Sequence, residues 1–340
     1  MNNTPDMKLD VYSLAEYTAG NKAITDSIGM TYAMLQKYQH PMCSISGGAD
    51  SDIIMDLCVR LDVDKKVRYV WFNTGMEYQA TKRHLDYLEH RYGVKIERVP
   101  PIKSIPQCCK EYGQPFISKY VSQCISSLQN RGFKWEDKSY EVLLEEYPGC
   151  QSRIAWWCNK NKRYCYNIKY NKWLKEFLIA HPPVFKVNPK CCEYAKKKPS
   201  VSFAKDNGCD LQIIGIRQAE GGIRSSLQSC YAEQTSPAKF YPIFWYGNTD
   251  KADYGRLFGI SNSDCYTVWG LKRTGCVGCP FNRKAFNELD VIKKNEPGMW
   301  KAANSVFGES YEYTRLYREF AGRHNSGDKT LNLFKEEGTE

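Results

Sequence analysis

Short apolar runs alternate with helix-period stretches through the N-terminal third of the chain. Residues 42–45 are mostly apolar and residues 67–72 are β-rich, as in buried strands, and residues 94–99 are a third strand candidate. After the first run, Ile53, Leu57 and Leu61 recur at the spacing of one helix face, and residues 78–92 also have a helical pattern. Strands that alternate with helices predict an α/β fold with a mostly parallel, doubly wound sheet.

Other parts of the chain predict helices without strands. Residues 8–38 carry a loose apolar stripe, and residues 102–190 contain helical and loop patterns only. The strand pattern resumes at 209–215, and from Phe286 onward the chain is amphipathic and helical. We therefore expect a catalytic domain over residues 1–281, interrupted by a helical insertion at about 102–190, and a helical extension over 282–340.

The turn after the first predicted strand carries the strongest signal for a function. It reads Cys43-Ser44-Ile45-Ser46-Gly47-Gly48-Ala49-Asp50-Ser51 and opens a helix. Two glycines permit positive φ angles and a close approach of the backbone, and a helix N-terminus directs N–H groups toward an anion. Ser46 and Ser51 add hydroxyl donors, and Asp50 can orient one of them or hold Mg²⁺. The loop is not a Walker loop, because no Gly-Lys-Ser/Thr follows the glycines. The alternative is a turn that merely contains two glycines.

Polar segments follow two further predicted strands. Asn73-Thr74-Gly75 follows residues 67–72, and Gly215-Ile216-Arg217 ends the strand that begins near Cys209, with Arg224 close behind. Ligands of open α/β sheets bind outside the carboxyl ends of strands, where these turns are expected. Two arginines suit bidentate binding of phosphate or sulfate, although two surface salt bridges are the alternative.

Composition and charge restrict the class of protein. The 340 residues are 42% hydrophobic and 25% charged, as in an ordinary globular protein, and the net charge of +10 favours an anionic partner. The N-terminus has no basic-then-apolar leader, and no apolar run approaches the ~20 residues that span a bilayer. We therefore expect a cytoplasmic protein without a membrane partner.

Basic and aromatic residues are interleaved over residues 153–175, where no acidic residue occurs. Such a pattern can form a surface for single-stranded nucleic acid or for an anionic small substrate. The alternative is an amphipathic segment whose aromatic side chains pack inward and whose lysines face water. The residues concerned are Arg153, Trp156, Trp157, Lys160, Lys162, Arg163, Tyr164, Tyr166, Lys169, Tyr170, Lys172, Trp173 and Lys175.

Fifteen cysteines are many for a chain in a reducing compartment, where metal ligation is a better explanation than disulfides. Cys191 and Cys192 are adjacent, and Cys276 and Cys279 form a CxxC pair. Adjacent thiolates suit two corners of a cluster better than one tetrahedral zinc ion. A CxxC pair can instead be a redox dithiol. The pairs Cys108–Cys109 and Cys158–Cys165 are weaker candidates, since nothing near them in the sequence completes a set.

Together, these motifs resemble the phosphoadenosine phosphosulfate (PAPS) reductase family, within the adenine nucleotide α-hydrolase-like superfamily of pyrophosphate-loop enzymes. The matching segments follow the family's order over residues 40–281: Ser46–Ser51, Asn73–Gly75, Lys190–Cys192, Gly215–Arg217 with Arg224, Tyr241–Ile243 and Gly275–Pro280. The resemblance implies an enzyme that binds ATP, PAPS or adenylylsulfate. The implied nucleotide-binding residues are Ser44, Ser46, Gly47, Gly48, Asp50, Ser51, Thr74, Gly75, Gly215, Arg217 and Arg224.

The cysteine pairs resemble those of assimilatory adenylylsulfate reductases, which hold a 4Fe–4S cluster. The resemblance therefore implies such a cluster on Cys191, Cys192, Cys276 and Cys279. Three positions depart from the family pattern. Asn73 replaces an Asp, Gly221 replaces a Ser, and no cysteine follows Cys279 to act as the sulfate-attacking thiol of a reductase.

The intact Ser-Gly-Gly-x-Asp-Ser string is closer to ATP-cleaving relatives, such as tRNA thiolases and the DNA phosphorothioation ATPase. We therefore expect an AMP-forming, ATP pyrophosphatase-type sulfurtransferase, with Asp50, Arg217 and Arg224 as the catalytic candidates. Its partners would be a sulfur donor protein and a nucleic acid acceptor. One alternative is an oxidoreductase that releases sulfite from PAPS or adenylylsulfate with a thiol-reductant protein. A second alternative is an inactive nucleotide-binding module of a complex.

Overall fold

The computed structural model describes residues 10–333 and divides them into two compact units. Unit 1 runs to Ile102 and resumes over Tyr194–Val277, and unit 2 contains Lys103–Glu193 and the chain from Gly278. The structure therefore groups the helical segment predicted at 102–190 with the C-terminal helices. Residues 8–9 of the first predicted helix, and residues 334–340 of the predicted extension, lie outside the described residues.

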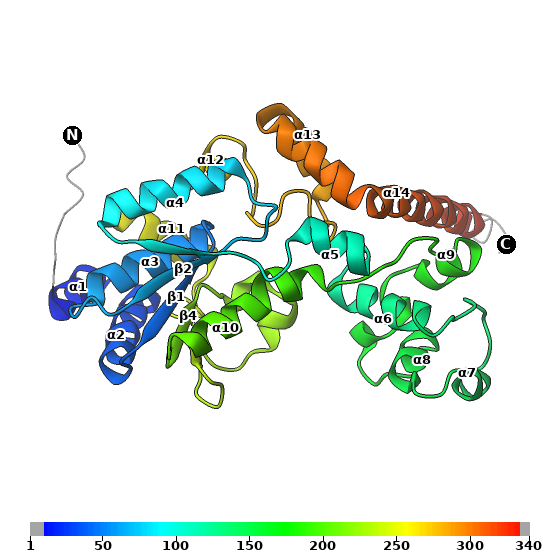
Figure 1. Ribbon diagram of the computed structural model, residues 1–340, viewed down its shortest axis with the longest axis horizontal. Coiled ribbons are helices and arrows are strands. Elements are labelled where there is room, and N and C mark those ends of the chain that lie inside the picture. Colours follow the sequence, from blue (N-terminus) through cyan, green and yellow to red (C-terminus); the bar gives the residue numbers. More distant parts are fainter. Residues whose placement is uncertain (1–9, 334–340) are drawn as a thin grey trace, which may run out of the picture. The chain divides into compact units, whose positions relative to one another are not determined.

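Unit 1 is a six-stranded sheet of order β3-β2-β1-β4-β6-β5 with helices on both faces (Figure 1). All neighbouring strands are parallel except β5 and β6, so the predicted α/β, mostly parallel, doubly wound fold is confirmed. The strands are β1 (Pro41–Ile45), β2 (Arg68–Phe72), β3 (Ile96–Val99), β4 (Leu211–Ile214), β5 (Tyr231–Ala232) and β6 (Ala238–Phe240). Its helices are α1 (Val11–Tyr17), α2 (Lys22–Lys37), α3 (Ala49–Leu61), α4 (Gln79–Tyr92), α10 (Lys198–Asp206), α11 (Asn248–Leu257) and α12 (Asp264–Thr267). Short helical turns are η4 (Gln218–Glu220) and η5 (Gly222–Ser226).

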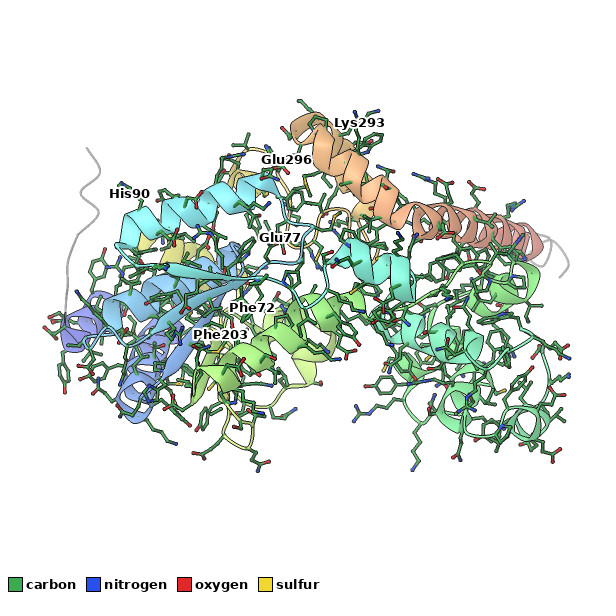
Figure 2. The ribbon with its side chains drawn as sticks, viewed as in Figure 1. Phe72, Glu77, His90, Phe203, Lys293 and Glu296 are labelled. Atoms are coloured by element: carbon green, nitrogen blue, oxygen red, sulfur yellow. The ribbon has the colours of Figure 1, made fainter. Side chains whose placement is uncertain are left out.

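Alternation along the strands supplies two apolar layers in unit 1. Cys43 and Ile45 of β1 join the larger core, which packs against α2, α3 and α4. The preceding Met42 faces the opposite side together with Val70 and Phe72. There, Phe72 meets Phe203 of α10 edge-on, with 6.2 Å between the ring centroids (Figure 2). The strand β1 therefore lies between two helical layers, which fixes the position of the turn that follows it.

The predicted helix over 8–38 is two helices in the structure. Asn21 lies just before α2 and is its N-cap. The Asn21 side chain accepts a hydrogen bond from the Ile24 N–H. A polar residue with capping geometry therefore interrupts the apolar stripe that predicted one helix.

Unit 2 is helical and has its own aromatic core. Its elements are α5 (Ile105–Tyr112), α6 (Lys119–Gln129), α7 (Tyr140–Glu146), α8 (Gln151–Trp157), η1 (Tyr164–Tyr166), η2 (Ile168–Tyr170), α9 (Leu174–Ala180), α13 (Ala285–Asn295) and α14 (Pro297–Leu333). A π-helical turn, η3 (Glu193–Lys197), follows Cys192, and its residues from Tyr194 onward belong to unit 1. Trp156, Trp157 and Phe177 are fully buried, and Tyr313 of α14 packs in the same cluster. Among the described residues, no helix has the length and apolar character that crossing a membrane requires.

Candidate functional site

The turn between β1 and α3 is built around two glycines in different conformations. Gly47 has a φ of +66°, and a Cβ at this position would lie 2.7 Å from Thr81 Cγ2 of α4. Gly48 is extended and is the N-cap of α3. A larger residue at position 47 would be strained by the positive φ angle and would collide with Thr81. The glycine is therefore required for this turn.

Hydroxyl groups hold the backbone of this turn. The Gly48 N–H donates to Ser51 Oγ at 3.1 Å and to Ser46 Oγ at 3.3 Å. The Ala49 N–H donates to the Tyr266 hydroxyl, whose pKa is raised by burial, so that the hydroxyl stays protonated. The turn therefore directs successive N–H groups to one side, where hydroxyl oxygens occupy the positions that suit phosphate oxygens.

Asp50 at the start of α3 lies between two cations. Its Oδ1 is 2.7 Å from Lys251 Nζ of α11 and 3.2 Å from Arg217 Nε, which is not aligned to donate to it. Arg217 is only 7% exposed, and its Nη1 donates to the Gly247 carbonyl at 3.3 Å and to Asn248 Oδ1 at 3.2 Å. The guanidinium group is therefore held in one orientation beside the turn, with its buried Nε directed toward Asp50.

These groups line one cavity of about 630 Å³, within the range of ligand pockets. The cavity lies where the sheet order reverses, because Ser46–Gly48 follows β1 and Gly215–Arg217 follows the adjacent β4. Five basic side chains and two acidic ones line it, which makes it a site for an anion. The charged residues are Asp50, Arg217, Glu220, Arg224, Lys251, Lys272 and Arg273.

The cavity contains most of the nucleotide-binding residues that the sequence predicts: Ser46, Gly48, Asp50, Ser51, Gly215, Arg217 and Arg224. Gly47 supports the turn from behind, facing Thr81. Ser44 instead accepts a hydrogen bond from Gln212 of β4 at 3.0 Å. Arg224 forms an ion pair with Glu220, which agrees with the salt-bridge alternative for this loop. Both residues nevertheless line the cavity.

The site predicted from the sequence did not include Lys251, Tyr266, Lys272, Arg273 and Thr274, which also line this cavity. Thr274 Oγ1 lies 3.2 Å from the Tyr266 hydroxyl, and a Cβ on Gly48 would lie within 3.2 Å of both side chains. The basic pair Lys272-Arg273, next to Thr274 and the CxxC segment, is the one signal that could have indicated this wall.

Thr74 and Gly75, predicted to bind the nucleotide, follow β2 and are not among the residues that line this cavity. Thr74 is fully buried, and its hydroxyl donates to Glu77 Oε1 at 2.7 Å. The Cys276 thiol donates to Thr74 Oγ1 at 3.6 Å, and Cys276 pairs with Glu77 in an antiparallel bridge. Glu77 is labelled in Figure 2. This turn therefore holds the first cysteine of the CxxC segment in place.

The other predicted cysteine ligands, Cys191, Cys192 and Cys279, belong to unit 2, where Cys191 forms hydrogen bonds with Cys192 and with Cys109. Hydrogen bonding with Cys109 is the main cause that raises the pKa of the Cys191 thiol, and Cys279 acts in the same direction. The hydrogen bond with Cys192 opposes this rise in the Cys191 pKa. Burial is the main cause that raises the pKa of Tyr311, and Cys279 and Cys109 also raise it.

The chemistry of this thiol set fits a soft metal centre. Among residues 10–333, no three His, Cys, Asp or Glu side chains are arranged to hold a single metal ion. An iron–sulfur cluster makes a different demand, because each iron corner takes one thiolate and the sulfurs are farther apart than around one ion. Thiolates are soft ligands that both zinc ions and iron–sulfur clusters take.

The structure buries one part of the basic aromatic stretch, residues 153–175, and exposes another. Trp156 and Trp157 are fully buried in the core of unit 2, as the packing alternative expects. By contrast, Tyr164, Tyr166 and Tyr170 are 58%, 40% and 48% exposed. The exposed basic neighbours of these tyrosines are Lys160, Lys162, Arg163, Lys169 and Lys172. We call this exposed segment, residues 160–172, the basic tyrosine segment.

Comparison with known proteins bears on the family. Residues 40–130 match the family model described as the phosphoadenosine phosphosulfate reductase domain, which confirms the predicted resemblance over β1, its loop and the following elements. A curated relative is an uncharacterized protein of Methanocaldococcus jannaschii, 21% identical over 316 residues. The alignment covers 89% of this chain, which spans 47% of that relative's length.

Two solved structures were also found to be similar. PAPS reductase from Candida auris, in a phosphate complex, is 14% identical with a TM-score of 0.42, covering 78% of this chain and 93% of that one. The U34-tRNA thiolase NcsA from Methanococcus maripaludis, with its [4Fe-4S] cluster, is 12% identical with a TM-score of 0.35. That alignment covers 86% of this chain and 80% of the thiolase.

Proposed function

We propose that this protein is an AMP-forming enzyme that cleaves ATP in the cavity of unit 1 and uses the activated product for sulfur transfer. The observation that carries the proposal is that the glycine turn and five basic side chains line the same cavity. Cationic groups around the N-terminus of a helix suit a polyphosphate. The family match over residues 40–130 supports an adenine nucleotide as the ligand.

In this reaction, a nucleophilic atom of the acceptor attacks the α-phosphorus of ATP. The bond from that phosphorus to the bridging oxygen breaks, pyrophosphate leaves with the electron pair, and AMP stays on the acceptor until sulfur displaces it. The N–H groups at residues 48–50 would hold the pyrophosphate, and Arg217 would neutralise the developing charge. Lys251 and Arg224 line the same cavity and would stabilise the leaving group.

The position of Asp50 favours ATP, which binds together with Mg²⁺, over a nucleotide that binds without a metal ion. Its carboxylate lies in a cavity built for phosphate, 2.7 Å from Lys251 and 3.2 Å from Arg217. Phosphate groups would compete for both cations, which leaves the carboxylate oxygens for Mg²⁺, a cation that binds nucleotides through carboxylate and phosphate ligands.

An iron–sulfur cluster, when bound, would supply iron sites that hold or deliver sulfur. In unit 2, the thiols of Cys191, Cys192 and Cys279 would ligate it. The proposed function assigns no role to Cys108, which is buried, or to Cys165, which is exposed.

The protein is expected to convert ATP to AMP and pyrophosphate when it is purified without oxygen and supplied with Mg²⁺. The nucleotides are separated by anion-exchange chromatography, and pyrophosphate is measured with a coupled pyrophosphatase. Turnover should disappear when EDTA removes Mg²⁺ and should rise when RNA or DNA is added as the acceptor. Release of ADP and phosphate, or binding of ATP without cleavage in the presence of every acceptor, would contradict the proposal.

The family match also favours a second candidate, because the model that matches is that of a PAPS reductase domain. In that reaction, a thiol attacks the sulfate sulfur of PAPS, the nucleotide leaves, and a second thiol releases sulfite as a disulfide forms. Sulfite release from PAPS or adenylylsulfate in the presence of thioredoxin, without ATP cleavage, would establish this candidate instead.

We further propose that the acceptor is a single-stranded nucleic acid bound through the basic tyrosine segment. Tyr164, Tyr166 and Tyr170 are exposed, and Lys169 Nζ lies 5.7 Å from the centre of the Tyr164 ring. Exposed aromatic rings offer faces on which bases stack, and the neighbouring cations neutralise phosphates.

Replacing Tyr164, Tyr166 and Tyr170 together with alanine is expected to weaken binding of single-stranded RNA by at least ~10-fold, since each stacked base contributes about 1–3 kcal/mol. Fluorescence anisotropy with a labelled oligonucleotide at fixed salt measures the change. Tyr12→Ala, at a tyrosine that is 84% exposed on unit 1, is the control and should bind as the wild type does. Equal affinities for the triple variant and the control would show that the segment is not the binding surface.

A further inference from the structure

A second cavity, of about 250 Å³, lies entirely within unit 2 and has no part in the site described above. Pockets for drug-sized ligands have volumes of about 300–1,000 Å³, so this one suits a single planar ring system and not a whole nucleotide. None of the described residues that line it is acidic. Its lining includes three aromatic and two basic side chains: Phe286, Tyr311, Tyr317, Arg283 and Arg318.

One wall of this cavity has a strained backbone. Ile117, which belongs to the lining, has a φ of +54°, a conformation that β-branched residues rarely adopt. On one side of it, Phe116 exchanges two hydrogen bonds of 2.8 Å with the Ser122 hydroxyl, and on the other, Ser118 is the N-cap of α6. Backbone strain persists where the surrounding contacts determine the conformation, and it is concentrated at ligand-binding sites. The wall at Ile117 is therefore held rigidly by its neighbours.

Polar contacts fix the same wall against α14. The Gln114 side chain donates to Glu309 Oε2 at 2.9 Å and accepts from the Ser310 N–H at 2.9 Å. The Ser310 hydroxyl in turn donates to the Pro115 carbonyl. This polar junction at Gln114 ties the segment that leads to Ile117 to the helix that supplies the opposite part of the lining, so the cavity is formed before a ligand binds.

Arg318 of α14 places a planar cation at the cavity. Its guanidinium carbon lies 4.6 Å from the centre of the Phe286 ring, and its Nη2 donates to the Arg283 carbonyl at 3.0 Å. Guanidinium planes and aromatic rings are surfaces on which unstacked bases are held in single-stranded nucleic acids. The positive charge also favours the phosphate that accompanies each base.

The cavity adjoins the basic tyrosine segment. Tyr317 lines the cavity, and its hydroxyl donates to the carbonyl of Lys172, the last residue of that segment, at 2.7 Å. Tyr120 of α6, three residues after Ile117, has its ring centre 5.2 Å from that of Tyr166. A single strand that follows the exposed tyrosines would therefore pass beside the cavity.

We propose that this cavity binds one unstacked base of a single-stranded nucleic acid whose neighbouring bases stack on the basic tyrosine segment. The inference rests on the proposed nucleic acid acceptor and adds a site for one base of it. Exposed tyrosines alone do not distinguish bases, since every base has a face that can stack. A cavity that encloses one base contacts its edges as well, which gives the protein a means to select among bases.

The test measures the affinity of the full chain for single-stranded RNAs of uridine, cytidine or adenosine only, at one length and one salt concentration, by fluorescence anisotropy. The wild type should bind one of the three at least ~5-fold more tightly than the others, about the smallest effect expected for the contacts of one base. Thr314→Phe, which places a ring in the cavity, should abolish this preference. The variant that lacks Tyr164, Tyr166 and Tyr170 should bind all three RNAs more weakly and keep the preference.

Arginine variants test the planar cation. Arg318→Ala and Arg318→Lys should both weaken binding of the preferred RNA by at least ~5-fold, because lysine keeps the charge but has no plane on which a base can stack. Arg315→Ala is the matched control and should bind as the wild type does. Arg315 lies on the same helix, 5.1 Å from the centre of the Phe286 ring, but it pairs with Glu312 and does not line the cavity.

A second measurement on the wild type avoids the risk that Thr314→Phe fails to fold. RNA that carries a photoreactive halogenated form of the preferred base should cross-link on irradiation to Phe286, Tyr311 or Tyr317, as identified by mass spectrometry. Cross-links confined to the basic tyrosine segment, equal affinities of the wild type for the three RNAs, or undiminished binding by Arg318→Ala would overturn the inference and leave that segment as the proposed acceptor site. A wild type that binds no RNA would overturn both. ATP cleavage measured without RNA on the same samples reports separately on the cavity of unit 1.

Discussion

Arg217→Ala is expected to lower kcat/KM for ATP cleavage by ~10²–10³-fold, the loss that follows removal of one preorganised charge-stabilising donor. Arg217 is buried, and its Nη1 is held by the Gly247 carbonyl and by Asn248, so the guanidinium group is oriented before a ligand arrives. Arg217→Lys should recover little activity, because an ammonium group cannot bond to these acceptors and to a phosphate in the same planar geometry. Pyrophosphate release under subsaturating ATP measures the effect.

Arg256→Ala is the control for the loss of one arginine from unit 1. The Arg256 side chain is 78% exposed and pairs with Asp253 at 2.8 Å, so its removal should leave cleavage unchanged. Thermal melting of both variants separates a catalytic effect from unfolding, since Arg217→Ala also leaves Asp50 with Lys251 as its one remaining ion-pair partner in the described part of the chain. Wild-type activity in a folded Arg217→Ala protein would remove Arg217 from the proposed mechanism.

Gly113→Ala is expected to destabilise unit 2 by more than about 4 kcal/mol, at the extreme of single substitutions. Gly113 has a φ of +112°, and an added Cβ would lie 2.1 Å from the Lys186 carbonyl oxygen and 2.5 Å from its carbon. That carbonyl cannot retreat easily, because it accepts the Gln114 N–H at 2.8 Å. Urea unfolding followed by circular dichroism should show the unit 2 transition at a much lower urea concentration.

Gly132→Ala separates the contact from the backbone conformation. Gly132 also has a positive φ, +67°, but an added Cβ meets nothing within 4 Å. The left-handed conformation alone should therefore destabilise this variant by about 1 kcal/mol. Equal destabilisation by both substitutions would mean that the close approach of Gly113 to Lys186 does not contribute.

The sequence allowed prediction of the parts of the site that follow directly from strand ends. The glycine turn after β1 and the Gly215–Arg217 turn after β4 were both predicted, because a glycine string or an arginine at the carboxyl end of a strand has a recognisable pattern. Lys251 and Tyr266 could not be predicted in the same way. They lie on helices whose polar residues resemble an ordinary solvated face until the chain folds back over the loop.

The cysteines show a different limit of sequence reasoning. Spacing drew attention to the pairs 191–192 and 276–279, but spacing along a chain does not report which segments pair in space. Cys191 forms a hydrogen bond with Cys109, which the sequence ranked as a weaker candidate because nothing near it along the chain completes a set. The strands β5 and β6 were missed because they contain only two and three residues, too few to produce an alternating pattern.

The polar junction at Gln114 also has a consequence for the order of events during synthesis. Its partners Glu309 and Ser310 are 195 and 196 residues away, so these contacts cannot form until α14 has left the ribosome. Contacts of such long sequence separation form late, because the intervening chain must first be closed into a loop. Cys109, Cys191 and Cys192 would therefore emerge as accessible thiols long before Cys279 joins them. Insertion of the proposed cluster is accordingly expected to follow translation, and nascent chains should depend on a reducing environment to keep those thiols from pairing.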